Sequence, residues 1–358
     1  MRVGIVGVGP VGDRIVRVLR ERGFPVDGDA VVMATSARPE VLDGRVFDVQ
    51  ETTEDSLRNL DVCFIAGKEG ARGASKTWRR VVERHQVPSI DNSSDFRMDD
   101  DVPLIVPEVN MDDAALNPKF IASPNCSTTQ MVVALAPLHR VATIKRIVVA
   151  TYQAVSGWGG KAMRELRKQA ARYLAGEPVE FDPSVFAHPI AFDYLPHIDR
   201  FDEGGYTREE VKMVCETRKI LHAPDLAISA TTVRVPVFVG HGEAINVEFE
   251  RKMSAEEALR ILRDPQTAPG VQVIDGPTDD PKAVAIREDV LERAYPVSRD
   301  LERPELADLV LVGRVRDDRT MPNAINLWVV ADNLRKGAAT NVVQIAEKMI
   351  DKGLLPSR

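Results

Sequence analysis

The sequence predicts an α/β protein of two domains, and three observations support this prediction. Its 358 residues exceed the size at which a single hydrophobic core usually stops growing. The first part alternates short apolar runs with amphipathic stretches, which is typical of a parallel sheet with helical crossovers. From Lys145 onwards, longer runs with polar alternation are mixed with helical patterns, which indicates a second, α+β domain.

The chain opens with a strand, a glycine turn and a helix. Arg2 to Val6 predicts the strand, Gly7-Val8-Gly9-Pro10-Val11-Gly12 the turn, and Arg14 to Arg20 the helix. Further strands are expected over 29–34 and 61–66, and a helix over 75–85. Because such glycines let backbone N–H groups approach a pyrophosphate, we expect a Rossmann-type dinucleotide-binding domain, although the turn alone could be purely structural.

The second part is expected to contain longer strands and several helices. We predict strands over 231–240 and 244–250, and helices over 160–174, 208–221 and 341–351. The segment from Asp264 to Arg303 is dense in Pro, Asp and Arg, which predicts irregular connections around short elements.

Charge, cysteine content and the amino terminus exclude several classes of protein. A net charge of −7 argues against a nucleic-acid partner, since such binders carry clustered Lys and Arg. The three cysteines have no C-x-x-C spacing, which indicates neither a disulfide framework nor a metal site. The amino terminus has neither a signal-peptide core nor a membrane-length apolar stretch, so we expect a cytoplasmic protein with no membrane partner.

The end of the second predicted strand indicates the type of dinucleotide. NAD-preferring sites usually carry an Asp or Glu there, whereas this chain reads Ala34-Thr35-Ser36-Ala37-Arg38. The Ser36 hydroxyl and the Arg38 guanidinium would suit a 2′-phosphate, so we predict NADP. Pro39 and Glu40 weaken this prediction, and Arg38 could instead be an ordinary solvated residue.

Cys126 is the candidate nucleophile. It precedes the apolar run Met131 to Leu138, which predicts a buried helix with Cys126 near its amino terminus. A helix amino terminus favours a thiolate and offers N–H donors to an oxyanion. Most single cysteines are small buried hydrophobes, and that interpretation fits Cys63 and Cys215 better than Cys126, whose neighbours are polar.

The stretch Pro124-Asn125-Cys126-Ser127-Thr128 resembles the active-site motif of the aspartate-semialdehyde dehydrogenases. Five further blocks carry the resemblance along almost the whole chain: Asp91 to Asn110, Thr151 to Gly157, Glu209 to Ile220, Thr232 to Gly242 and Trp328 to Glu347. It implies the NADPH-dependent conversion of β-aspartyl phosphate to aspartate semialdehyde and phosphate through a cysteine thioester, in lysine, methionine and threonine biosynthesis.

The resemblance also implies a domain organisation. We expect an NADP-binding domain over 1–124, completed by a C-terminal helix in 334–358, and a catalytic and dimerisation domain over 125–333. The expected assembly is a homodimer or homotetramer. The glycine turn is one residue shorter than is usual in the family, which is a departure at the cofactor site.

Roles follow for residues that match the family pattern. Cys126 matches the nucleophile, His241 the general acid/base, and Gln153 the residue that orients the acyl intermediate. The implied substrate-binding residues are Arg234 for the α-carboxylate, Glu209 for the α-ammonium group, Lys212 and Arg97 for phosphate, and Asn125 as a support. The expected cofactor-binding residues are Gly7, Gly9, Pro10, Val11, Gly12, Ser36, Arg38, Ser156, Gly157 and Gln344.

Several of these residues have ordinary alternative interpretations. On their own, Glu209 and Lys212 would be a salt bridge on a solvated helix face, and Asn125 and Gln153 would be polar turn residues. A histidine such as His241 could simply satisfy backbone groups in a turn.

The spacing of Arg234 and His241 requires a bend in the chain if both side chains are to face the same site. The two residues are seven apart, so an unbroken strand would point them to opposite faces. A bend is required, and Pro236 and the pair Gly240 and Gly242 are the places where we expect it.

Two other functions stay open. Related reductases act on N-acetylglutamyl phosphate, usually with a different cysteine motif, or on a malonyl thioester of coenzyme A. A malonyl reductase could share Cys126, Arg234 and His241. A catalytically inactive paralogue that serves as a binding partner would be expected to lack the cysteine or the histidine, and this chain has both.

Overall fold

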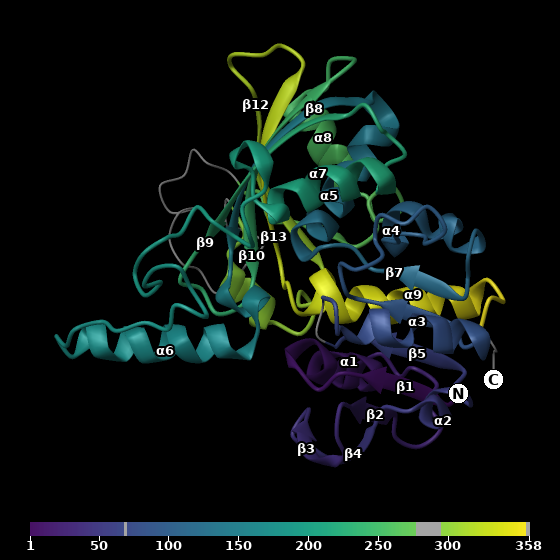
Figure 1. Ribbon diagram of the computed structural model, residues 1–358. Coiled ribbons are helices and arrows are strands. Elements are labelled where there is room, and N and C mark those ends of the chain that lie inside the picture. Colours follow the sequence, from purple (N-terminus) through teal and green to yellow (C-terminus); the bar gives the residue numbers. More distant parts are fainter. Residues whose placement is uncertain (68–69, 277–294, 356–358) are drawn as a thin grey trace. The chain divides into compact units, whose positions relative to one another are not determined.

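The computed structural model describes residues 1–67, 70–276 and 295–355 (Figure 1). The chain divides into two units, one of Met1–Asn125 with Gly337–Arg358 and one of Cys126–Lys336. The divisions predicted from the sequence lie after residues 124 and 333. The functions that it gave to the two domains stay predictions.

A seven-stranded sheet with the strand order β3-β4-β2-β1-β5-β6-β7 forms the first unit. Its strands are β1 (Val3–Val6), β2 (Val31–Ala34), β3 (Arg38–Leu42), β4 (Arg45–Glu51), β5 (Val62–Ile65), β6 (Ser89–Asp91) and β7 (Phe120–Ala122). All neighbouring strands are parallel except β3 and β4. The strand order reverses at β1, which is where open α/β sheets bind ligands.

The helices of this unit include the three that the sequence predicts over 14–20, 75–85 and 341–351. They are α1 (Pro10–Glu21), α2 (Glu54–Leu57), α3 (Ala74–Arg84), α4 (Pro107–Asn110) and α9 (Thr340–Asp351), with the short 3-10 helix η1 (Met111–Ala115). The C-terminal helix α9 shares one apolar core with β1, because Val342, Ile345 and Met349 pack in the same cluster as Val3 and Ile5. The C-terminal helix therefore packs with the first sheet, and its expected part in an NADP-binding domain stays a prediction.

The hairpin of β3 and β4 was not predicted from the sequence. Most residues of its strands are exposed, charged residues interrupt the apolar ones, and Pro39 lies in the edge strand, so the hydrophobic pattern was weak. The signal that could have revealed it is the turn. Asp43 and Gly44 both have positive φ, at 49° and 71°, which is the two-residue hairpin turn that Asp-Gly favours.

A six-stranded mixed sheet with the order β11-β12-β13-β10-β8-β9 forms the second unit. Its strands are β8 (Ile144–Gln153), β9 (Ala227–Arg234), β10 (His241–Phe249), β11 (Val271–Val273), β12 (Val310–Asp317) and β13 (Ala324–Ala331). Its α-helices are α5 (Cys126–Ala142), α6 (Gly160–Leu174), α7 (Arg208–Ile220) and α8 (Ala255–Leu262). Short helical turns lie at η2 (Val155–Trp158), η3 (Glu203–Gly205) and η6 (Ser298–Glu302), and η7 (Arg335–Ala339) spans the division before Gly337.

Helix α5 packs on the sheet and is apolar almost all round. Thirteen of its seventeen residues are buried, and it contacts α7, α8 and the strands β8, β10, β12 and β13. A helix that is hydrophobic on every side belongs in a protein interior. The prediction of a buried helix that starts near Cys126 is therefore confirmed.

The predicted strand over 231–240 is wrong after Arg234, where β9 ends. The chain runs without regular structure to His241, the first residue of β10, through Pro236 and through Gly240 with a φ of 96°. The bend that the spacing required is confirmed at these two residues. Gly242 is not part of it: this residue lies inside β10, where an added Cβ would come within 2.5 Å of the Trp328 ring.

The region from 264 to 303 is only partly described. It contains the short elements β11 and η6, and residues 277–294 of the predicted irregular connections lie outside the described residues. Within the described parts of the chain, no helix is long and apolar enough to cross a membrane.

Candidate active site

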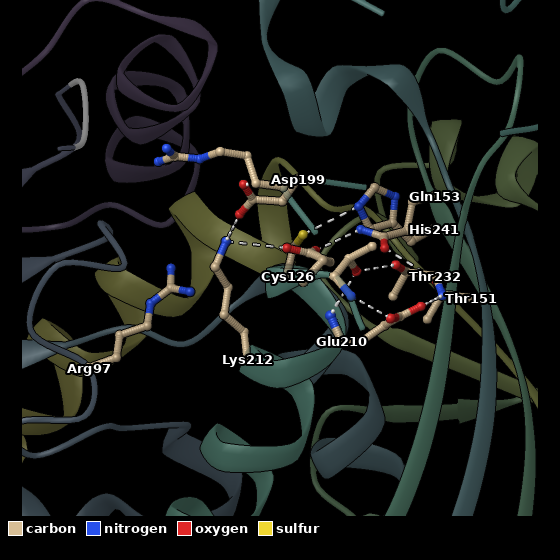
Figure 2. A network of polar contacts seen from close by, with 12 residues as sticks. Arg97, Cys126, Thr151, Gln153, Asp199, Glu210, Lys212, Thr232 and His241 are labelled. Atoms are coloured by element: carbon tan, nitrogen blue, oxygen red, sulfur yellow. Dashed lines mark hydrogen bonds and ion pairs between the residues drawn. The ribbon is translucent and has the colours of Figure 1, made fainter. Parts of the chain in front are cut away.

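The structure brings Cys126 and His241 into direct contact in the second unit. Cys126 is the first residue of α5 and His241 the first residue of β10, and their Sγ and Nε2 atoms are 3.3 Å apart (Figure 2). His241 is fully buried, whereas Cys126 is partly exposed. A thiol at a helix amino terminus beside an imidazole is an arrangement that suits a nucleophile.

A backbone contact fixes which nitrogen of His241 carries the proton. The N–H of Ala154 donates to Nδ1 at 3.0 Å, so a neutral His241 must carry its proton on Nε2 and donate it toward Cys126 Sγ. Burial lowers the pKa of His241 well below its ordinary value, and the charge of Arg234 lowers it further. The imidazole is therefore a neutral N–H donor toward the sulfur.

Arg234, the last residue of β9, lies at the same point of the second unit. Its Nη1 donates to the carbonyl oxygen of Ala154 at 2.7 Å, and the residue is buried. Burial lowers its pKa, while the negative charges of Glu209 and Cys126 oppose that change. The structure therefore places a guanidinium, a thiol and an imidazole together.

Gly157 marks the space in front of this group. An added Cβ there would lie 2.9 Å from Nη1 of Arg234 and 3.5 Å from the ring of His241. A side chain at this position would fill the site, so the glycine keeps it open. The predicted contact of Gly157 with a cofactor stays a prediction.

Gln153, Glu209 and Lys212 form a second polar group in this unit. Gln153 Nε2 donates to Glu209 Oε1 at 3.0 Å, and Lys212 Nζ lies 3.5 Å from Glu209 Oε2. Lys212 Nζ also lies 2.8 Å from Asp199, and this ion pair is labelled in Figure 2. Glu209 is buried, unlike a residue on a solvated helix face. The structure thus brings together Gln153, Glu209 and Lys212 as the predicted site requires, but it does not test their roles.

Two polar residues that contact predicted site residues were not predicted from the sequence. They are Asp199, which pairs with Lys212, and Asn333, which contacts Ser156. Burial raises the pKa of Asp199, but the hydrogen bond and charge of Lys212 outweigh it, so this pKa is below its ordinary value. Asn333 Nδ2 donates to the Ser156 hydroxyl at 2.9 Å, and its Oδ1 accepts the Gly240 N–H at 3.0 Å. Asn333 lies in the block Trp328 to Glu347, which could have identified it, whereas Asp199 lies in none of the blocks.

Arg97, Asn125 and Gln344 belong to the first unit. Arg97 is buried, and its Nη2 donates to the carbonyl oxygen of Asn92 at 2.9 Å. Asn125 is buried and is the last residue of this unit before α5 begins. Gln344 lies in α9 and is partly exposed. Their contacts with substrate or cofactor stay predictions.

The glycine turn after β1 has the close packing of a dinucleotide-binding turn. Gly7 has a φ of 125°, and an added Cβ would lie 2.5 Å from the Ala66 carbonyl oxygen. A Cβ on Gly12 would collide with the carbonyl of Gly7, whereas one on Gly9 would meet nothing within 4 Å. Pro10 and Val11 begin α1, whose amino terminus is the usual place for a pyrophosphate.

Ser36 and Arg38 lie together just after β2. Arg38 Nη1 donates to the Ser36 backbone carbonyl at 3.1 Å and to its hydroxyl at 3.3 Å, and Nε donates to Glu40 at 3.1 Å. Both residues are exposed. The Ser36 hydroxyl and the Arg38 guanidinium are thus adjacent at the end of the second strand, and the guanidinium is also bound to the Glu40 carboxylate.

The chain contains a sheet that is parallel except for the β3–β4 hairpin and a mixed sheet that carries a Cys–His pair, and two family models of a dehydrogenase, a class of oxidoreductase, match these two parts. They are described as the NAD binding domain of semialdehyde dehydrogenase, over residues 2–116, and its dimerisation domain, over residues 135–336. The aspartate-semialdehyde dehydrogenase of Aquifex aeolicus is 46% identical over 363 residues, which cover 99% of each chain. The chain belongs to the aspartate-semialdehyde dehydrogenase family.

Solved structures agree with this family. Aspartate semialdehyde dehydrogenase II of Vibrio cholerae superposes with a TM-score of 0.86 at 41% identity, over 98% of each chain. The complex of that enzyme with ASA superposes with a TM-score of 0.85 at 40% identity, again over 98% of each chain.

We expect His241 to be neutral, with its proton on Nε2, at neutral pH and above, because burial and the charge of Arg234 hold its pKa well below the ordinary histidine value. The measurement is ¹⁵N ring spectra of histidine-labelled protein, with His241 assigned through His241→Asn and a histidine peptide as the reference. A titration midpoint close to that of the peptide, or a proton on Nδ1, would contradict the structure.

Proposed function

We propose that this chain reduces β-aspartyl phosphate to aspartate β-semialdehyde with NADPH, releasing phosphate, through a thioester on Cys126. The observation that carries the proposal is the 3.3 Å contact of Cys126 Sγ with His241 Nε2 at the start of a buried helix. The family supplies the substrate class, since the relatives matched over the whole chain are named for aspartate semialdehyde.

The nucleophilic step uses Cys126 as a thiolate. Its sulfur attacks the acyl carbon, the C–O bond to phosphate breaks, and phosphate leaves with the electron pair. The charge of Arg234 and the positive end of the α5 dipole stabilise the thiolate and the oxyanion that forms. The product of this step is a thioester.

The reductive step returns the sulfur as a thiolate. When bound, the reduced cofactor supplies a hydride to the thioester carbon. The resulting oxyanion collapses to the aldehyde, and the C–S bond breaks. The reductive step balances without a proton, so His241 acts in it chiefly as an N–H donor, and the proton on Nε2 suits that task. The one proton that the overall reaction takes up is gained by the phosphate released in the first step. The geometry supports the acid part of the predicted acid/base role.

Recognition of the amino-acid head is assigned to Arg234 and Glu209. The guanidinium is held by the Ala154 carbonyl, which fixes its orientation for a bidentate carboxylate. Glu209 is held by Gln153 and Lys212, so its carboxylate is fixed before an ammonium group arrives. Lys212 would then face phosphate with its charge shared by Asp199, and Arg97 and Asn125 would complete the substrate contacts.

NADP is the cofactor we propose. The close packing of Gly7 and the open space at Gly9 leave the start of α1 accessible to a pyrophosphate. Ser36 and Arg38 would hold the 2′-phosphate, for which Arg38 would exchange its contact with Glu40. Ser156, Gly157 and Gln344 are the remaining residues that we assign to the cofactor.

We propose that the second unit also assembles copies of the chain, as a homodimer or a homotetramer. The family model over residues 135–336 is described as a dimerisation domain, which supports this assignment. We place the protein in the cytoplasm, and its three free thiols suit a reducing compartment.

Replacing Cys126 with Ala should lower turnover at least about a thousandfold and leave the cofactor affinity unchanged, because the thioester requires a thiolate. The measurement is phosphate-dependent reduction of NADP by aspartate semialdehyde. Cys63→Ala is the control: its thiol is fully buried with a pKa raised to about 12, so turnover should persist. Turnover of Cys126→Ala within tenfold of the wild type would remove the mechanism.

Replacing Arg38 with Ala should raise the KM for NADPH about tenfold or more and leave that for NADH nearly unchanged, because only NADPH has the 2′-phosphate. Arg45→Ala is the matched control, since Arg45 is an exposed arginine of the same hairpin and pairs with Asp29. Equal changes for the two cofactors in Arg38→Ala would show that Arg38 is not the discriminator.

Glu209→Gln should lower kcat/KM for aspartate semialdehyde by roughly 30- to 150-fold, about 2 to 3 kcal/mol, because a desolvated charge pair is broken. Arg234→Lys should also be harmful, since an ammonium cannot hold a carboxylate with two parallel hydrogen bonds. With malonyl-CoA, which has no amine, only Arg234→Lys should be harmful. If Glu209→Gln reduced aspartate semialdehyde turnover no more than that of malonyl-CoA, the amino-acid substrate would be wrong.

A further inference from the structure

Glu243 is a buried carboxyl group that the proposed mechanism does not use. It lies two residues after His241 on β10, on the same buried face of the strand, between Thr151 of β8 and Val329 of β13. The side chain has no solvent exposure. Within the described part of the chain, neither of its carboxyl oxygens has a hydrogen-bond partner. An ionised carboxylate in such a place would be very costly.

Gln130 of α5 is the side chain whose amide interacts with the Glu243 carboxyl group. It lies one helical turn after Cys126 and is fully buried, and its Nε2 donates to the backbone carbonyl of His241 at 3.4 Å. Its Oε1 is a further buried oxygen for which the described residues offer no partner. Gln130 therefore joins the helix that carries the thiol to the strand that carries the imidazole.

The three unpaired oxygens of Glu243 and Gln130 match one another once a single proton is added. A carboxylic acid donates its O–H to an amide oxygen and accepts an amide N–H at its carbonyl oxygen. This arrangement gives a partner to both oxygens of Glu243 and to Gln130 Oε1. The second N–H of the Gln130 amide is then free to donate to the His241 carbonyl, as the structure shows.

We propose that Glu243 is a protonated carboxylic acid that pairs with the Gln130 amide, and that this pair is a positioning element for Cys126 and His241. The chain of contacts runs from the acid on β10 to the amide on α5 and back to the backbone of His241. It holds the first turn of α5 at a fixed distance from the start of β10. The pair deepens the proposed function, because it rests on Cys126 and His241 as the reacting residues.

The surroundings of Glu243 favour the protonated form. Burial raises the pKa of Glu243 well above its ordinary value, and the Gln130 side chain lowers it by less. Neighbouring His241 is held neutral, so it offers no positive charge to an ionised Glu243. A neutral acid paired with a neutral amide satisfies this pocket without a buried charge.

The first test compares two substitutions at Glu243. Glu243→Gln keeps a neutral donor and acceptor, so kcat should stay within about threefold of the wild type. Glu243→Met removes both, and we expect kcat and the rate of Cys126 alkylation by iodoacetamide to change, with kcat falling about 10- to 100-fold at little change in KM. The control is Glu248→Met on the same strand, where the carboxylate is paired with Lys145 at 2.9 Å.

Several outcomes of this comparison would overturn the proposal. One is an equal loss of kcat in Glu243→Gln and Glu243→Met, which would show that an anion is needed. Another is a Glu243→Met enzyme with the kcat and alkylation rate of the wild type. Gln130→Met should resemble Glu243→Met, and the losses of the two variants should not add in the double variant, as expected of residues that act as a unit.

The second test does not depend on how well the Met variants fold. The infrared spectrum of the wild-type protein at neutral pH should contain the C=O stretch of a protonated carboxylic acid that is absent from Glu243→Gln. Its absence from the wild type would overturn the proposal whatever the kinetics. The band is also independent of the reaction, so an active Cys126→Ala enzyme would remove the proposed function while leaving the acid–amide pair intact.

Discussion

The backbone of Ala154 binds the two side chains on which the site depends, the imidazole of His241 and the guanidinium of Arg234. Its N–H donates to His241 Nδ1, and its carbonyl oxygen accepts from Arg234 Nη1. Ala154 follows β8 directly, and β8 is paired with both β9 and β10. The imidazole tautomer and the guanidinium orientation are therefore set by the sheet, and a side-chain substitution at this residue would not remove the contacts.

Burial then determines how each group behaves. His241, Arg234 and Glu209 are all shielded from water, and each is held by at least one hydrogen bond. A low effective dielectric strengthens these contacts and makes an isolated charge expensive. The site consequently combines a neutral imidazole with a guanidinium whose charge is matched by Glu209 and Cys126. Such a set of fixed dipoles suits a reaction in which negative charge develops on oxygen and sulfur.

Elements with a strong local hydrophobic pattern could be predicted from the sequence, whereas elements with a weak pattern could not. The apolar runs of β1, β2 and β5 and the helix that begins at Cys126 stand out because they are buried on all sides. The edge hairpin of β3 and β4 was missed because most of its residues are exposed, and its buried residues, Leu42, Phe47 and Val49, are too few to form a clear apolar run. Motif resemblance gave Arg234 and Glu209, but Asp199 and Glu243 depend on contacts between residues far apart in the chain, which no local pattern contains.

The distance between Cys126 and His241 cannot be set by local chain geometry, since 115 residues separate them. It depends on how α5 packs on β10, and apolar packing fixes the depth of a helix on a sheet better than its rotation or its shift along the axis. Directional contacts between helix and strand supply what apolar packing lacks. Gln130 provides one to the His241 carbonyl, one turn from the thiol, and the protonated Glu243 would fix the amide that makes it. The proposed pair of Gln130 and Glu243 thus has a geometric function. Apolar packing alone would bury the helix, whereas the polar pair also defines the distance between Cys126 Sγ and His241 Nε2.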